Sequence, residues 1–130
     1  MSVFNCWRAV NCVVLISCLT GAAWSAAPLN QLANHPSPYL ALHGSDPVAW
    51  QEWNADTLAR ARRENKLLFV SVGYFACHWC HVMQRESYKN KQTAAILNRD
   101  FIPVKVDREL SSGLDDAVQN FSARRTGASG

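Results

Sequence analysis

Leu67-Leu-Phe-Val-Ser-Val72, followed closely by Cys77-His-Trp-Cys80, is the stretch that decides the fold of this chain. The six-residue run stands between Lys66 and Gly73 and is rich in apolar and β-branched side chains, which predicts a strand buried on both faces. From Cys77 onward, apolar residues recur at helical spacing. The C-x-x-C pair is therefore expected where a buried strand ends and a helix begins.

This position of the C-x-x-C pair favours thiol chemistry. The first turn of a helix has unpaired backbone N–H groups and the positive end of the helix dipole, and both favour a thiolate over a thiol. Cys77 is therefore the candidate nucleophile. Cys80 lies one turn further in, within reach of the same sulfur, and is the candidate resolving thiol. We predict thiol–disulfide exchange, in which Cys77 attacks a disulfide and Cys80 resolves the mixed disulfide.

The composition indicates one small globular domain and argues against two classes of partner. The chain has 130 residues and a formal net charge of +3, which is too small to indicate binding to nucleic acid or to an anionic membrane. Of its five cysteines, Cys6, Cys12 and Cys18 lie in the N-terminal segment. A mature chain keeps only the Cys77/Cys80 pair, which describes a redox dithiol better than a disulfide framework.

Residues 1–25 have the pattern of an export signal peptide. Arg8 supplies a charged region, residues 10–19 an apolar stretch, and Ala23-Trp-Ser25 a small-x-small cleavage site. Two alternatives stay open, an uncleaved membrane anchor and a lipoprotein with its lipidated N-terminus at Cys18. In every version we expect the rest of the chain to leave the cytosol for the periplasm, with no stable membrane insertion after signal cleavage.

The segment from residue 26 to residue 53 is rich in Pro, Asn and Ser and is predicted to be irregular. Within it, the Asp46-Pro47 pair has an N-cap and N1 arrangement, which predicts a short helical turn over Val48–Trp53 with its two tryptophans on one face. Asn54 is expected to cap a surface helix over Ala55–Asn65.

The helix predicted from Cys77 is amphipathic by its spacing. Its side chains are expected on two faces, with apolar Trp79, Val82 and Met83 on one and polar Gln84 and Arg85 on the other. A polar run over Ser87–Lys91 is expected to break the helix.

The elements after this break predict a βαβ unit. A helix is expected over Gln92–Asn98, with Ala94, Ala95 and Leu97 facing inward. A strand is expected over Phe101–Asp107. A strand, a helical crossover and a second strand form parallel neighbours. A last amphipathic helix is expected around Leu114–Phe121, so the domain is α/β.

Two other chemistries use cysteines and histidines at this spacing. Cys77-His-Trp-Cys80-His81 satisfies the C-x-x-C-H pattern of haem attachment, which leaves a haem-binding electron carrier as an alternative. The buried strand that runs into the motif counts against this interpretation. A zinc site needs a second ligand pair from a distant segment, for which only His35 and His43 are available. We expect no metal and no cofactor.

Three residues in the motif are predicted to modulate the cysteines. His78 can place a hydrogen bond or a positive charge beside Cys77 and so stabilise the reduced form. His81 can move the proton of Cys80, and Trp79 is expected to shape the docking surface around the sulfur. For each histidine the alternative is a plain exposed side chain on the first turn.

Several short motifs, taken together, are far more specific than C-x-x-C alone. They are Ser37-Pro-Tyr-Leu40, His43, Asp46-Pro-Val48 with Trp50, Ala61–Lys66, Gly73-Tyr74, Cys77–Met83, Glu86-Ser87 and Val104–Glu109. From about Asn30 onward, the chain resembles the thioredoxin-like family that includes the DsbH-type periplasmic oxidoreductases and the N-terminal domain of spermatogenesis-associated proteins. The resemblance implies a thioredoxin-like fold with Cys77 and Cys80 as the redox pair, protein disulfides or dithiols as substrates, and a redox partner protein.

Two departures limit what the resemblance implies. Thioredoxins proper carry a buried acid in the strand before the motif, where this chain has Ser71, so proton transfer to and from Cys80 needs another route. Family members also continue past Thr126–Gly130 into a further strand, a β-hairpin and a final helix. The thioredoxin-like domain over residues 54–130 is therefore expected to be incomplete, and a catalytically inactive truncated module is the alternative function.

Overall fold

A computed structural model describes residues 29–128 of the chain, and the predicted export signal lies outside these residues. The elements follow in the order α1 (Pro38–Leu42), α2 (Ala55–Glu64), β1 (Leu67–Gly73), α3 (His78–Met83), the π-helix η1 (Gln84–Tyr88), α4 (Lys91–Asp100), β2 (Phe101–Asp107) and α5 (Ser112–Thr126). This mixture of helices around a small parallel sheet is the α/β, thioredoxin-like fold that the sequence predicted.

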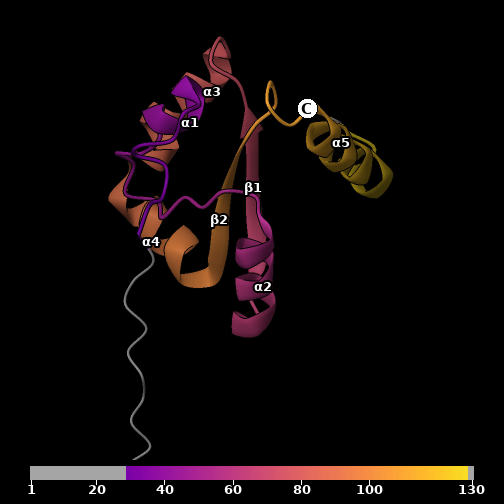
Figure 1. The fold of residues 1–130 in the computed structure, drawn as a ribbon, viewed down its shortest axis with the longest axis horizontal. Coiled ribbons are helices and arrows are strands. Elements are labelled where there is room, and N and C mark those ends of the chain that lie inside the picture. The colour runs from indigo at the N-terminus through magenta and orange to yellow at the C-terminus, as the bar shows by residue number, and fades with distance from the viewer. Residues whose placement is uncertain (1–28, 129–130) are drawn as a thin grey trace, which may run out of the picture.

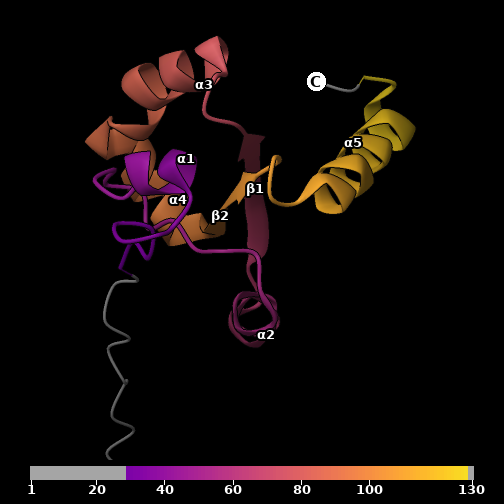
Figure 2. The ribbon, with the colours of Figure 1, turned by 45° about the horizontal axis from the view of Figure 1, so that its top comes forward.

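The centre of the fold is the parallel pair of β1 and β2. Their register runs from Leu67 opposite Phe101 to Gly73 opposite Asp107, which confirms the predicted βαβ unit. Figure 1 shows the strands in the middle, with α1, α3 and α4 on one side, α5 on the other and α2 beyond the lower end of β1. The view turned by 45° keeps this division (Figure 2). The crossover through α3, η1 and α4 therefore covers one face of the strand pair, as a parallel connection requires.

Each face of the strand pair carries its own buried cluster. The cluster on the side of α1, η1 and α4 contains Leu32, Tyr39, Leu40, Val48, Trp50, Tyr88, Ala94 and Leu97. The cluster on the side of α2 contains Ala61, Ile102, Val104 and Val106. Strand β2 is the more deeply buried of the two strands, because it has β1 on one edge and the segment around Gln51 on the other.

The N-terminal segment folds differently from the prediction. Its helix is α1, where Ser37 Oγ accepts a hydrogen bond from Leu40 N–H at 3.1 Å and Pro38 occupies the first helical position. The helical turn predicted over Val48–Trp53 is wrong. Gln51 is extended there and pairs with the backbone of β2, donating at 2.9 Å and accepting at 3.0 Å. The backbone partners offered by β2 therefore outweigh the local Asp46-Pro47 signal.

The two tryptophans of this segment also have different surroundings. Trp50 is completely buried in the core, whereas Trp53 is 38% exposed. They do not share a helical face because the backbone between them is extended beside β2. In an extended strand, side chains alternate between the two sides, so residues three positions apart point in opposite directions.

Strand β1 has the predicted position but less burial than predicted. Its residues before Gly73 are partly exposed, and Leu67 is largely exposed. In the described part of the chain, β1 has a single strand neighbour, β2. The apolar run therefore identified the strand correctly but overestimated its burial.

The faces of the helix after the C-x-x-C motif agree with the prediction for Arg85, which is exposed, but not for Trp79, Met83 and Gln84. Trp79 is 75% exposed, whereas Gln84 is only 5% exposed. The Gln84 amide donates hydrogen bonds to buried acceptors, which hold it inward. The π-helix η1 continues α3 as far as Tyr88, so the predicted break falls at Asn90, which caps α4. A π turn changes the angular spacing of side chains, which the 3.6-residue pattern does not anticipate.

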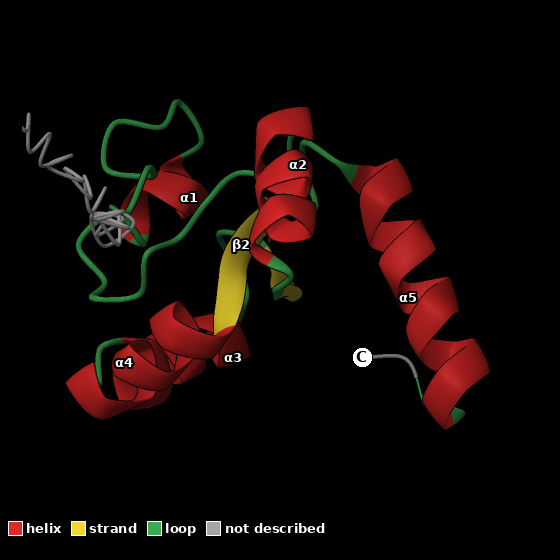
Figure 3. Cartoon of the chain, turned by 90° about the horizontal axis from the view of Figure 1, so that it is seen from below, coloured by secondary structure: helices red, strands yellow, loops and turns green. Residues whose placement is uncertain are grey.

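The other helices lie where the sequence predicted them, but only some of their side chains are buried as predicted. Asn54 Oδ1 accepts from Thr57 N–H at 2.9 Å, which confirms the cap of α2. In α4, Ala94 and Leu97 are buried as predicted, but Ala95 is exposed. Helix α5 stands apart from α1, α3 and α4 (Figure 3), and Phe121 on it is exposed.

Candidate active site

The candidate active site lies where β1 passes into α3. Cys77 and Cys80 form a disulfide there, with their Cα atoms 5.3 Å apart. Cys77 is the N-cap of α3, and its Sγ accepts a hydrogen bond from Cys80 N–H at 3.2 Å. An N–H group directed at this sulfur, together with the positive end of the helix, stabilises a thiolate on Cys77 in the reduced chain.

The surface around the disulfide is largely apolar. Phe75, Trp79 and Met83 are all exposed there. His78 is also exposed, with its ring edge-on to Trp79 at 5.3 Å between centroids. His81 Nε2–H donates to the carbonyl oxygen of Phe75 at 2.7 Å, which ties the helix to the loop before the disulfide. The modulating roles of these two histidines and of Trp79 stay predictions.

Gly73, the last residue of β1, lies against both Tyr39 and Cys80. A Cβ atom on Gly73 would stand 2.8 Å from Cys80 Sγ and closer still to Tyr39 Oη. The Tyr39 hydroxyl is buried and has no hydrogen-bond partner among the described residues. The resolving sulfur and this hydroxyl therefore crowd the same point on the strand, and glycine makes the room for them.

Gly73→Ala is expected to lower the free energy of unfolding of the disulfide form by about 1–3 kcal/mol, because the new methyl group overpacks this contact. Denaturant unfolding measures the change. The control is Gly113→Ala, since a Cβ on Gly113 meets nothing within 4 Å. A Gly73→Ala chain as stable as the parent would show that the Tyr39 and Cys80 side chains are not tightly held.

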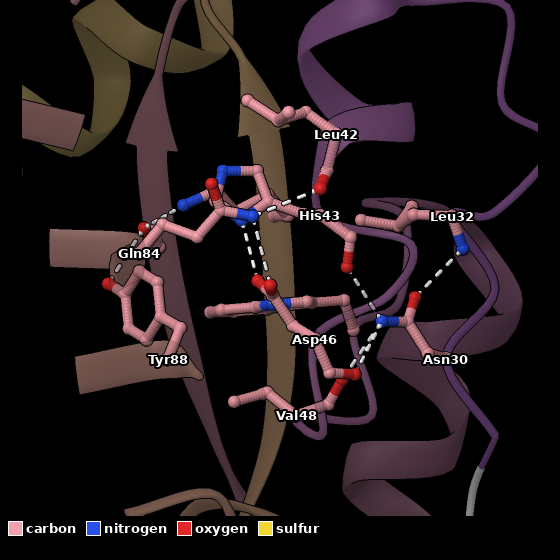
Figure 4. A network of polar contacts seen from close by, with 11 residues as sticks. Asn30, Leu32, Leu42, His43, Asp46, Val48, Gln84 and Tyr88 are labelled. Atoms are coloured by element: carbon pink, nitrogen blue, oxygen red, sulfur yellow. Dashed lines mark hydrogen bonds and ion pairs between the residues drawn. The ribbon is translucent and has the colours of Figure 1, made fainter. Parts of the chain in front are cut away.

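A buried carboxylate, Asp46, organises a network of polar residues (Figure 4). Asp46 Oδ2 accepts from His43 Nδ1–H at 2.7 Å and from Trp50 Nε1–H at 3.1 Å. Asp46 Oδ1 accepts from Gln84 Nε2–H at 2.9 Å, and the same amide donates to Leu42 O at 3.0 Å. The network thus ties α1 and the loop after it to η1.

The charge states in this network follow from burial and hydrogen bonding. Burial lowers the pKa of His43, so its imidazole is neutral near pH 7. Burial alone raises the pKa of Asp46, but hydrogen bonds from His43 and Gln84 outweigh it and hold that pKa below its usual value. Asp46 is therefore a buried anion surrounded by neutral donors.

A buried lysine lies on the same face of the sheet. Lys105 is 2% exposed, and its Nζ donates to Ser71 Oγ at 2.9 Å. Tyr88 Oη donates to the same oxygen at 3.1 Å. The Nζ atom lies 4.6, 5.0 and 5.4 Å from the ring centroids of Tyr88, Trp50 and Tyr39. Burial lowers the pKa of Lys105 to about 7, against a smaller opposing effect of Asp46.

The sequence identified the two cysteines but not the residues beneath them. Lys105 looked like an ordinary polar position in the alternating pattern of a strand. A parallel strand is usually buried on both faces, so a lysine within it could have indicated an unusual, buried charged group. His43, Asp46 and Trp50 belong to the short motifs named above, but no local pattern showed that they form one network or that Gln84, 38 residues after Asp46, completes it.

The two histidines that a zinc site would have needed outside the motif have other partners. His43 is held by Asp46, and His35 Nδ1 accepts from Ser37 N–H at 3.0 Å. Within residues 29–128, no three His, Cys, Asp or Glu side chains gather in a way that could hold a metal ion. None of the helices in this part of the chain is long and apolar enough to cross a membrane.

Comparison with known proteins agrees with this geometry. Residues 29–130 match the model of the family Thioredox_DsbH, described as a protein of unknown function, DUF255. Uncharacterized protein B0495.5 of Caenorhabditis elegans is 43% identical over 101 residues, which are 78% of this chain and 14% of that protein. Spermatogenesis-associated protein 20 is 45% identical over 92 residues in Homo sapiens and 44% over 93 in Mus musculus. These matches cover 71% and 72% of this chain and 12% of either relative.

Proposed function

Because this chain belongs to the thioredoxin-like Thioredox_DsbH family, we propose that it is a thiol–disulfide oxidoreductase domain with Cys77 as nucleophile and Cys80 as resolving thiol. One observation carries the proposal. The C-x-x-C disulfide lies at the end of a β-strand, and the N–H of Cys80 points at Cys77 Sγ at the start of the following helix. That arrangement stabilises the thiolate that disulfide exchange requires.

The exchange proceeds in two steps. In the reductive direction, the Cys77 thiolate attacks one sulfur of a substrate disulfide, and the other substrate sulfur leaves as a thiolate with the bonding electron pair. Cys80 then attacks Cys77 Sγ, closes the Cys77–Cys80 disulfide and releases the second substrate sulfur. Two electrons pass from the domain to the substrate, and the reverse sequence oxidises a dithiol.

The proposal extends to substrates and location. The exposed apolar side chains of Phe75, Trp79 and Met83 around the disulfide support protein disulfides or dithiols as substrates, since an apolar patch suits a protein segment. A separate redox partner protein restores the starting state of the cysteines. Export to the periplasm is proposed from the signal-like pattern of residues 1–25 alone.

Turnover of a protein disulfide tests the proposal. In an insulin-reduction assay with a chemical reductant, Cys77→Ser is expected to slow catalysis by about a hundredfold or more, because the attacking sulfur is lost. Cys80→Ser is the matched variant, since it also lacks the disulfide but keeps the nucleophile. It is expected to accumulate a mixed disulfide with the substrate, detectable by mass spectrometry.

Either of two results contradicts the proposed function. The first is a Cys77→Ser chain that keeps the parent rate. The second is a parent chain whose thiols react no faster than those of the same chain in denaturant.

A further inference from the structure

Cys80 and the buried amine of Lys105 line the same pocket. Its volume is about 230 Å³, and its walls are Ser71, Val72, Trp79, Cys80, Met83, Tyr88 and Lys105. Trp79 and Met83 are exposed, so the pocket reaches the surface, whereas Lys105 lies at its buried end. A water molecule takes up about 30 Å³ in the liquid, so the pocket has room for a short water chain between sulfur and amine.

The Lys105 amine is placed to change its protonation state. Among residues 29–128 no carboxylate pairs with it; its hydrogen bond goes to Ser71 Oγ, a hydroxyl that can both accept and donate. Since burial lowers the pKa of Lys105 to about 7, its neutral and charged forms are both populated near neutral pH. The titratable groups around it are Tyr39 from α1, His43 and Asp46 from the next loop, Tyr88 from η1, Cys80 from α3 and Asp107 from its own strand.

The other groups near Cys80 are poorer proton acceptors. Asp46 is saturated by its three donors, which hold its pKa below the usual value. Burial raises the pKa of Tyr39, which keeps its hydroxyl neutral. His81 is not among the residues that line the pocket, and its Nε2–H donates to the carbonyl oxygen of Phe75 outside it. Lys105 is the remaining group that combines a near-neutral pKa with access to the pocket of Cys80.

We propose that Lys105 accepts the proton of Cys80, directly or through pocket water, when Cys80 resolves the mixed disulfide. The inference rests on the proposed function. The Cys80 S–H proton moves to the neutral amine, the new thiolate attacks Cys77 Sγ, the Cys77–Cys80 bond forms, and the bond between Cys77 and the substrate breaks. The substrate sulfur leaves with the electron pair. In the oxidative direction the Lys105 ammonium returns the proton to Cys80.

The test separates the two chemical steps. A chain with Cys6, Cys12 and Cys18 replaced by serine, so that only two thiols remain, is reduced and mixed with 5,5′-dithiobis(2-nitrobenzoate). The first coloured thiolate reports attack by Cys77, and the second reports resolution by Cys80. In Lys105→Met the first release is expected to stay within about twofold of the parent, and the second to slow about tenfold or more near pH 7. The variant's second step is also expected to keep accelerating at higher pH, where the parent rate levels off.

Two further variants separate the chemistry from structural effects. Lys105→Arg keeps the positive charge but cannot give up its proton at these pH values, so it is expected to slow resolution as methionine does. Lys89→Met removes an exposed lysine and is expected to leave both releases unchanged. The proposal is overturned if Lys105→Met resolves at the parent rate with the parent pH profile, or if Lys105→Arg restores that rate, since charge alone would then suffice.

A measurement on the parent chain keeps the inference testable if the variants do not fold. In a chain labelled with ¹³C-lysine, the ε-carbon signal of Lys105 is expected to titrate near neutral pH, with different midpoints in the disulfide and dithiol forms. The same midpoint in both forms would overturn the proposal. A parent chain whose first release is no faster than that of Cys77→Ser contradicts the proposed function instead, so the two failures are distinguishable.

Discussion

Replacing Asp46 with alanine is expected to lower the free energy of unfolding by about 3–5 kcal/mol, the cost of breaking a buried, hydrogen-bonded charged group. The carboxylate accepts hydrogen bonds from His43, Trp50 and Gln84, and all three side chains are buried. Removal leaves three buried donors without their acceptor, and each unsatisfied donor costs about 1–3 kcal/mol. Urea unfolding of the disulfide form measures the loss.

Asp116→Ala is the control for this variant. Asp116 is exposed on α5, so its removal is expected to change stability by less than about 0.5 kcal/mol. An Asp46→Ala chain within about 1 kcal/mol of the parent would show that the network does not hold the loop after α1 against η1.

The stability of the disulfide form is expected to increase by about 2–3 kcal/mol between about pH 6 and pH 9, because Lys105 is buried. Its pKa is about 7 in the folded chain, against 10.5 for a lysine without these surroundings. Between these values the unfolded chain binds more protons than the folded chain, so the free energy of unfolding rises with pH. Below about pH 7 both states hold the proton, and the cost of the buried charge is fully present.

Lys105→Met isolates this contribution. Methionine keeps the apolar stem but cannot titrate, so its unfolding free energy is expected to be nearly constant over the same range. The lowered pKa of His43 acts with the same sign, but at lower pH, below the usual histidine value of 6.5. An identical slope above pH 7 in Lys105→Met and in the parent would show that Lys105 keeps an ordinary pKa.

Local sequence rules placed the two cysteines of the C-x-x-C motif correctly between a strand and a helix, because their position depends on short-range physics. An apolar β-branched run predicts a strand, and the change to helical spacing at Cys77 predicts where the helix begins. The cap of α2 at Asn54 and the parallel pairing of β1 with β2 follow from equally local or topological rules. These predictions agree with the structure because no contact with a distant segment opposes the local rule.

Tertiary contacts decided the points where local rules failed. Gln84 has the local pattern of a surface residue, yet buried acceptors on Asp46 and Leu42 hold it inward. The Asp46-Pro47 pair has the pattern of a helix start, yet Gln51 is extended because β2 offers backbone partners. In both cases a buried hydrogen bond outweighs a propensity of a few tenths of a kcal/mol to about 1 kcal/mol.

The sequence by itself determined that the chain is an α/β domain with a C-x-x-C pair between a strand and a helix, since periodicity and spacing are properties of neighbouring residues. Only the tertiary structure decided what lies beneath that pair. Ser71 and Lys105 become neighbours through strand register, and Tyr39 meets Cys80 across Gly73. The burial that shifts the pKa of Lys105 depends on aromatic rings from three separate segments, and no local pattern encodes it.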